Sequence, residues 1–144
     1  MDEITVATSR VLSGLLAGTY VAFLVAVMPA LHDQPDDVFA RVMNRINVVI
    51  VNPAFLLLFL GAPVVTAMAL WWNRTPLMVA AVVLAVVAVV ITAAANIPLN
   101  DALAAGGSRS DFETPWLIWH SVRTAATVAS FVLLSLPAAS PAGR

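Results

Sequence analysis

The chain has 144 residues, of which 61% are hydrophobic and only 10% are charged, and its mean hydropathy is +0.95. Since a soluble domain carries about 25% charged residues, this composition excludes a monomeric soluble protein and predicts lipid as the solvent. The net charge of −1 offers no basic surface to nucleic acid, and the absence of cysteine excludes disulfides, thiolate catalysis and cysteine-bound metals.

Four apolar stretches are long enough to cross a bilayer, which requires about 20 residues in a helix. They predict membrane helices near residues 8–30, 48–72, 77–96 and 116–136. The third and fourth stretches each follow a threonine–proline pair, Thr75–Pro76 and Thr114–Pro115, which is typical of an N-cap followed by the first residue of a helix.

The first stretch contains Gly14 and Gly18, a pair of small residues spaced one helical turn apart. Such a pair allows close contact between helices, either within the bundle or between two copies of the chain. A homo-oligomer formed through Gly14 and Gly18 is therefore one interpretation, and ordinary packing within the bundle is the other.

Residues 32–52 differ from the four stretches because they combine acidic residues at the start with apolar residues at helical spacing. This pattern predicts an amphipathic helix at the membrane interface that leads into the second span. Asn52–Pro53 then indicates either an N-cap with a proline at the first helical position or a kink within one long helix. The apolar pattern continues through the proline, so we prefer the kink.

These elements predict an all-α fold, an integral membrane four-helix bundle. Residues 1–137 form a single transmembrane domain in this interpretation, and residues 138–144 form a disordered C-terminal tail. Four spans place both termini on the same side of the membrane. Arginines are equally divided between the two sides, so the positive-inside rule does not assign the orientation.

Polar side chains gather at one end of the predicted bundle, where the end of the first and third spans meets the start of the second and fourth. We expect them to enclose one pocket that opens towards the face with the first and third loops. The candidate residues are Asn47, Asn96, Asn100, Asp101, Trp116, Trp119, His120 and Arg123.

The fourth span carries the strongest of these signals. Trp116, Trp119, His120 and Arg123 share one helical face because they are spaced at i, i+3, i+4 and i+7. An arginine inside the hydrocarbon is costly unless it faces the bundle interior with a partner. Arg123 therefore indicates a functional site, a structural ion pair with Asp101, or a side chain that snorkels to the interface.

The asparagines also allow structural interpretations: Asn96 and Asn100 as caps or turn residues, and Asn47 as part of a solvated interfacial face. With only two histidines, a three-histidine zinc site is excluded within one chain. An iron site from His32, His120 and either Asp101 or Asp33 stays an alternative. We predict that the protein uses no metal and no organic cofactor.

Three sequence pieces resemble the anthrone oxygenase family of small four-helix membrane proteins. They are Arg45–Ile46–Asn47 followed by Asn52–Pro53, then Asn96–Ile97–Pro98–Leu99–Asn100–Asp101, then Trp119–His120–Ser121–Val122–Arg123–Thr124. The resemblance covers most of the chain, roughly residues 10 to 135. It implies the four-helix fold and the oxidation of an anthrone to an anthraquinone by O₂ without a metal or flavin.

The resemblance also implies roles for the candidate residues. Arg123 would hold the developing phenolate, and His120 or Asp101 would take the proton. Further hydrogen bonds to the substrate would come from Asn47, Asn96 and Asn100. Trp116 and Trp119 would form aromatic walls around the ring system, with an interfacial aromatic belt as the alternative.

Two other functions compete with the enzyme. One is a non-enzymatic membrane protein, an accessory or assembly subunit in which the polar cluster is structural. The other is a transporter component, but the chain shows no internal repeat of the kind that transporters carry. A complete polar site within one chain favours the enzyme, whose partners would be the lipid bilayer and a small flat aromatic substrate, with O₂ as co-substrate.

Overall fold

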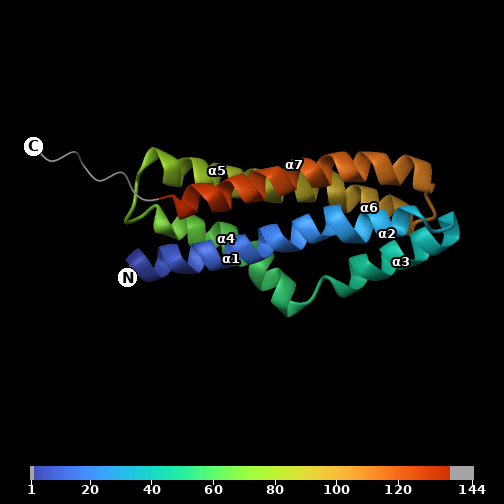
Figure 1. The fold of residues 1–144 in the computed structure, drawn as a ribbon, viewed down its shortest axis with the longest axis horizontal. Coiled ribbons are helices and arrows are strands. Elements are labelled where there is room, and N and C mark those ends of the chain that lie inside the picture. Colours follow the sequence, from blue (N-terminus) through green and yellow to red (C-terminus); the bar gives the residue numbers. More distant parts are fainter. Residues whose placement is uncertain (1, 137–144) are drawn as a thin grey trace, which may run out of the picture.

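The computed structural model describes residues 2–136, and within this range every element is helical (Figure 1). The disordered tail predicted for residues 138–144 lies outside the described residues. In chain order the elements are α1 (Asp2–Ala22), the π-helix η1 (Phe23–Val27), α2 (Met28–His32), α3 (Asp36–Val49), α4 (Pro53–Ala69), α5 (Pro76–Ile91), the π-helix η2 (Thr92–Asn96), α6 (Ile97–Ala104) and α7 (Arg109–Ser135).

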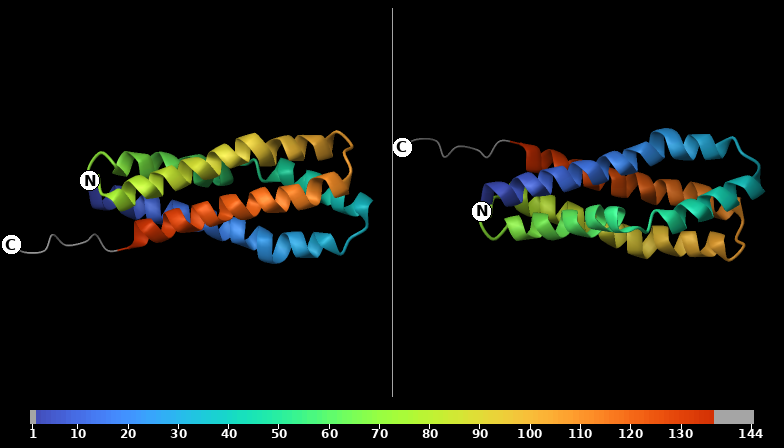
Figure 2. Two further views of the ribbon diagram at one scale, coloured as in Figure 1. Left: turned by 90° about the horizontal axis from the view of Figure 1, so that it is seen from above. Right: turned by 90° about the horizontal axis from the view of Figure 1, so that it is seen from below.

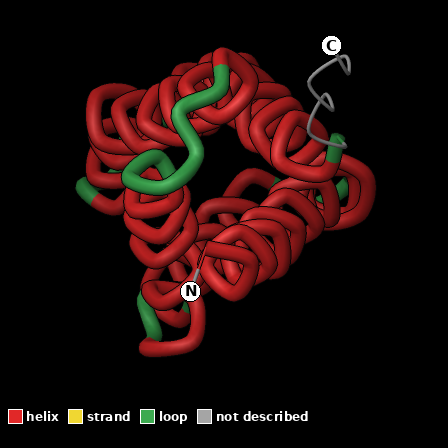
Figure 3. Tube along the Cα trace, turned by 90° about the vertical axis from the view of Figure 1, so that its left-hand side faces the viewer, coloured by secondary structure: helices red, strands yellow, loops and turns green. Residues whose placement is uncertain are grey.

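The elements form four rods that lie side by side, which confirms the predicted helical bundle (Figures 1 and 2). The rods are α1–η1–α2, α3–α4, α5–η2–α6 and α7. The end-on view shows them arranged around a common axis (Figure 3). Around this axis α1 contacts α4 and α7, and α5 contacts α4 and α7, so each rod has two main neighbours.

The outer surface of the bundle is apolar, as expected for an integral membrane protein. Three helical segments are long and apolar enough to cross a bilayer: Glu3–His32, Pro76–Ala104 and Arg109–Ser135. The bent pair α3–α4 makes a fourth if it is taken as one span. Large side chains such as Leu57, Val64, Val83 and Val90 are more than half exposed, which is unfavourable in water and favourable in lipid.

Two of the rods continue through a proline. Pro29 and Pro98 each lie two residues after a π-helical segment, η1 and η2. A proline has no N–H to donate and its ring displaces the preceding turn, and a wider π-turn accommodates both effects. The third rod therefore continues to Ala104, and the predicted end near residue 96 is wrong.

The fourth rod also begins earlier than predicted. Ser108 is its N-cap, because the Ser108 hydroxyl accepts a hydrogen bond from the N–H of Asp111 at 3.1 Å. Thr114–Pro115 therefore lies inside α7 and does not begin it. The equivalent expectation for Thr75–Pro76 is confirmed, since Thr75 caps α5 by accepting from the N–H of Met78 at 3.3 Å.

The rod formed by α3 and α4 is broken at Asn52 by a bend of 70°. The side chain of Asn52 accepts from the N–H of Phe55 at 3.1 Å and donates to the carbonyl of Val49 at 3.0 Å. It thus caps both helices across the break, and Pro53 occupies the first position of α4. The preferred interpretation of one kinked helix is wrong, and the N-cap alternative is correct.

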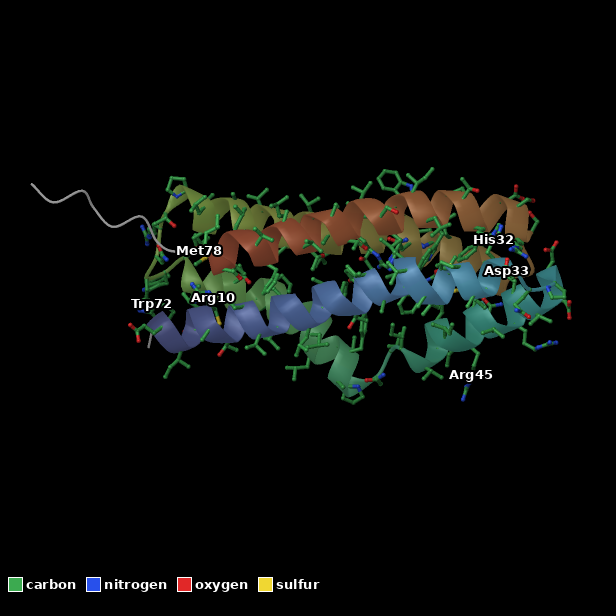
Figure 4. The ribbon with its side chains drawn as sticks, viewed as in Figure 1. Arg10, His32, Asp33, Arg45, Trp72 and Met78 are labelled. Atoms are coloured by element: carbon green, nitrogen blue, oxygen red, sulfur yellow. The ribbon has the colours of Figure 1, made fainter. Side chains whose placement is uncertain are left out.

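Apolar clusters fill the two ends of the bundle. Near the loops at the His32 end, Phe39, Met43 and Trp116 belong to one cluster of fully buried side chains. At the opposite end, Ala69, Met78, Ala81 and Leu134 form a second cluster. Figure 4 labels His32 and Asp33 at one end and Arg10, Trp72 and Met78 at the other. A layer of polar side chains lies between these clusters.

The glycine pair has two different environments. A Cβ atom on Gly14 would lie 3.0 Å from the ring of Phe131, so Gly14 is used for close packing between α1 and α7. Gly18 faces open space, since a Cβ atom on it would meet no other atom within 4 Å. Contact between two copies through this pair stays a prediction.

Candidate functional site

The polar layer is centred on Arg123 of α7, whose side chain is buried although it is charged. Its Nε donates to Nδ1 of His120 at 2.9 Å, and its Nη1 donates to the hydroxyl of Thr92 at 3.0 Å. The guanidinium carbon lies 4.6 Å from the centre of the Tyr20 ring, within the range of a cation–π interaction. The ring centre of Trp116 lies 5.6 Å from the same carbon. Arg123 is therefore held by four neutral groups from three different rods.

No carboxylate pairs with this guanidinium among the described side chains. Its Nη2 makes no hydrogen bond to any described residue. A buried cation without a counter-charge is costly. The arrangement is suited to a group that supplies the missing negative charge and accepts hydrogen bonds from Nη2.

His120 contacts Arg123 with one ring nitrogen and the backbone with the other. Its Nε2 lies 3.0 Å from the carbonyl oxygen of Tyr20, which can only accept, so Nε2 carries the hydrogen. Nδ1 is then the acceptor for Arg123, and the imidazole is the neutral Nε2–H tautomer. The ring also stacks on Trp116, with ring centres 4.5 Å apart and planes 15° apart.

A cavity of about 240 Å³ lies beside this cluster and reaches the surface of the bundle. Five polar, five aromatic and four aliphatic residues line it: Asn47, Thr92, Asn100, His120 and Arg123; Tyr20, Phe23, Phe55, Phe59 and Trp116; Ile50, Val51, Leu56 and Ile97. The exposed fraction of the lining residues rises along the cavity, from 0% for His120 and 2% for Trp116 to 63% for Val51. The cavity therefore has a buried polar floor, aromatic walls and an apolar rim.

The asparagines divide into two groups. Asn47 and Asn100 line the cavity, and Asn100 also accepts a hydrogen bond from the indole N–H of Trp116 at 2.8 Å. The amide nitrogen of Asn47 is buried and has no hydrogen-bond partner. Asn96 is buried but does not line the cavity; its amide donates to the carbonyl of Trp116 at 3.4 Å. Asn96 thus contacts the backbone of Trp116 from outside the cavity lining.

Over residues 39–133, more than half of its length, the chain matches the family described as anthrone oxygenase. The chain belongs to the anthrone oxygenase family. The match confirms the resemblance seen in the three sequence pieces. It includes the polar floor on η2 and α7, whereas Tyr20 and Phe23 on the first rod lie outside it. No curated relative and no solved structure matches the chain.

Besides Asn96, two of the residues suggested by the anthrone oxygenase resemblance lie outside the cavity lining. Asp101 is exposed on α6 and forms no ion pair with Arg123, so the predicted Asp101–Arg123 pair is wrong. The helix continues past Pro98 and carries Asp101 about 13 Å along its axis beyond Thr92, at 1.5 Å per residue. Trp119 is 44% exposed and does not line the cavity, so its surroundings match the interfacial belt.

Tyr20, Phe23 and Thr92 line the cavity but are absent from the candidate residues predicted from the sequence. Phe23 and Thr92 are the first residues of η1 and η2, so each π-helix begins at the cavity wall. π-helical turns occur often at functional sites. The available signals were the prolines two residues after each π-helix and the fact that Tyr20 is the single tyrosine of the chain.

The residues of the alternative iron site are separated in the structure. His120 bonds to Tyr20 and Arg123, whereas Nδ1 of His32 lies 2.7 Å from a carboxylate oxygen of Glu113 at the loop end. Across residues 2–136, no three histidine, aspartate or glutamate side chains come together as a metal-binding group. Glu113 and His32 instead belong to an ionic network around Arg109, which also contacts Asp36.

Proposed function

We propose that this member of the anthrone oxygenase family oxidises a flat phenolic aromatic, of the anthrone type, with O₂ and without a cofactor. The observation that carries the proposal is the unpaired guanidinium of Arg123 at the floor of an aromatic-walled cavity. A phenolate oxygen bound at Nη2 would supply the missing negative charge. Preorganised donors in a buried site are most effective for a charge that develops during the reaction.

The shape and lining of the cavity suit a compact ring system. The rings of Tyr20, Phe23, Phe55 and Trp116 offer apolar surfaces from three rods. A volume of about 240 Å³ is slightly below the roughly 300–1,000 Å³ of pockets for drug-sized ligands. The cavity therefore favours a small planar molecule over a long or branched one.

The chemistry requires acid–base and electrostatic help more than a redox group. Loss of one proton from the methylene opposite the anthrone carbonyl gives an aromatic phenolate, and this electron-rich anion reduces O₂ directly. In the complete reaction the methylene loses two hydrogens and gains one oxygen atom of O₂. The other oxygen atom leaves as water with those two hydrogens, so the substrate gives four electrons to O₂.

Within this proposal His120 accepts the proton, because Asp101 does not reach the cavity. In the resting structure Nδ1 of His120 accepts from Arg123. When the guanidinium turns towards the substrate oxygen, Nδ1 becomes free to take a proton. The hydrogen bond from Nε2 to Tyr20 fixes the ring, and the stacked indole of Trp116 stabilises the imidazolium that results.

The test is O₂ consumption by purified protein in lipid nanodiscs supplied with an anthrone. Anthrones also oxidise slowly without protein, so empty discs and discs with Arg123→Met provide the background. We expect stoichiometric anthraquinone with one oxygen atom from ¹⁸O₂, at a rate well above both controls. Turnover equal to the background in the folded protein would support the accessory-subunit alternative. Stoichiometric iron or copper in the active protein would contradict the cofactor-free mechanism.

A further inference from the structure

The rim of the cavity lies on the side of the bundle, and no residue of the first and third loops lines it, so the predicted opening towards the face with those loops is wrong. Three apolar side chains of the lining are well exposed: Val51 at 63%, Ile97 at 46% and Leu56 at 38%. They come from the α3–α4 break, the start of α6 and the first turns of α4. The cavity thus reaches the surface between the second and third rods.

The helix break creates this opening. α3 ends at Val49 and α4 begins at Pro53, with a 70° bend between their axes. Non-helical backbone inside the hydrocarbon is tolerated only where it is buried in protein or lines a cavity, so a partly exposed break is expected at the edge of the hydrocarbon. Ile50 and Val51 of the break line the cavity, and Asn52 satisfies the backbone on both sides of it.

The length of α4 places the break at a boundary of the hydrocarbon. α4 has 17 residues, about 25 Å at 1.5 Å per residue, and the hydrocarbon core is about 30 Å thick. Trp71 and Trp72 follow α4 and are exposed, as in an aromatic belt at the opposite boundary. On the other side of the break, Arg45 projects outward from α3 (Figure 4), where a headgroup would meet it.

We propose that an amphiphilic aromatic substrate enters the cavity sideways from the bilayer, through a mouth formed by Val51, Leu56 and Ile97 at the boundary between hydrocarbon and headgroups. This inference rests on the proposed function for the identity of the substrate. Planar phenolic molecules accumulate at this boundary because their rings prefer lipid and their oxygens prefer the headgroup region. The mouth and its ligand therefore lie at the same depth.

Asn47 gives the passage a polar side. It lies just before the break, lines the cavity, and has a buried amide nitrogen without a partner. An oxygen on the trailing edge of the substrate would accept from this amide while the leading oxygen reaches Arg123. The inferred substrate class is thus a planar aromatic with oxygen atoms on two edges.

A pair of adjacent substitutions tests the mouth by turnover in nanodiscs. Leu56→Trp places a bulky indole at the rim, whereas Leu57→Trp places the same group on the lipid-facing side of α4, outside the cavity lining. We expect kcat/KM to fall about tenfold or more in Leu56→Trp and to stay within about twofold of the wild type in Leu57→Trp. Equal activities in the two variants would overturn the lateral entrance.

A labelling experiment tests the mouth without any turnover. The chain contains no cysteine, so Val51→Cys and Leu57→Cys each carry a single thiol, and the two positions are equally exposed at 63%. A hydroxyanthraquinone in the same nanodiscs should slow labelling of position 51 by a lipid-soluble maleimide about tenfold and leave position 57 unchanged. Protection at neither position, or equally at both, would overturn the mouth. Protection in a protein without oxygenase turnover would defeat the proposed function alone.

Discussion

Replacement of Arg123 by methionine separates the effect of the buried charge on the free energy of unfolding from its effect on catalytic activity. The substitution removes two hydrogen bonds from a charged group, each worth about 1.5–3 kcal/mol. The cation–π contacts with Tyr20 and Trp116, worth about 1–2 kcal/mol together, are lost as well. It also removes the desolvation penalty of an unpaired buried cation, which is several kcal/mol. These contributions have similar size and opposite sign, so we expect the free energy of unfolding to change by less than about 2 kcal/mol.

Activity should respond far more strongly than stability. Loss of one preorganised oxyanion donor reduces kcat by about 10²–10³, so Arg123→Met should lower kcat/KM by at least this factor. The assay combines thermal unfolding in detergent with anthrone-dependent O₂ uptake in nanodiscs. If the variant loses more than about 3 kcal/mol of stability while its folded fraction keeps full turnover, Arg123 is structural and the reasoning is refuted.

Three further substitutions test other parts of the structure. His120→Phe keeps an aromatic ring beside Trp116 but leaves Nε of Arg123 without its acceptor. We expect the free energy of unfolding to fall by about 1–3 kcal/mol in thermal unfolding. We expect turnover, measured by O₂ uptake, to fall about 10²–10⁴-fold. Asn52→Ala removes an N-cap and should cost about 1 kcal/mol in chemical unfolding; no loss would show that the break is held by other contacts. Arg109→Ala removes hydrogen bonds to the backbone carbonyls of His32 and Gln34, so it should speed backbone hydrogen exchange in the loop before α3 and leave substrate affinity unchanged. Unchanged exchange would mean that the ionic network does not order this loop.

The sequence predicted the bundle well because hydrophobic run length is a local signal. Proline position was a weaker guide, since Thr75–Pro76 begins a helix as predicted whereas Pro98 and Pro115 lie within continuous rods. It also predicted that His120 and Arg123 meet, since three residues along a helix bring two side chains onto one face, and the structure joins them by a hydrogen bond of 2.9 Å. The face assignment holds for Trp116, His120 and Arg123, which line the cavity from the continuous helix α7, but not for Trp119, which lies outside the cavity.

The partner of Arg123 could not be predicted from the same pattern. A π-helical turn inserts one extra residue, so every side chain after it is rotated about the helix relative to a regular α-helix. η2 has this effect on the third rod, where Thr92 at its start reaches Arg123 and Asp101 beyond it faces outward. Tyr20 was missed for a different reason, since a tyrosine in an apolar stretch gives no periodic signal that distinguishes a cavity wall from the core.

Binding of an aromatic oxyanion at Arg123 is the step on which the proposed reaction depends most directly. A hydroxyanthraquinone is a suitable probe because its phenol and phenolate forms absorb visible light at different wavelengths. In nanodiscs at a pH where the free probe is a phenol, wild-type protein should bind it with the phenolate spectrum, because the guanidinium favours the charged form. Arg123→Met should bind it without that spectral change, and identical spectra and affinities for the two proteins would contradict the assignment of the site.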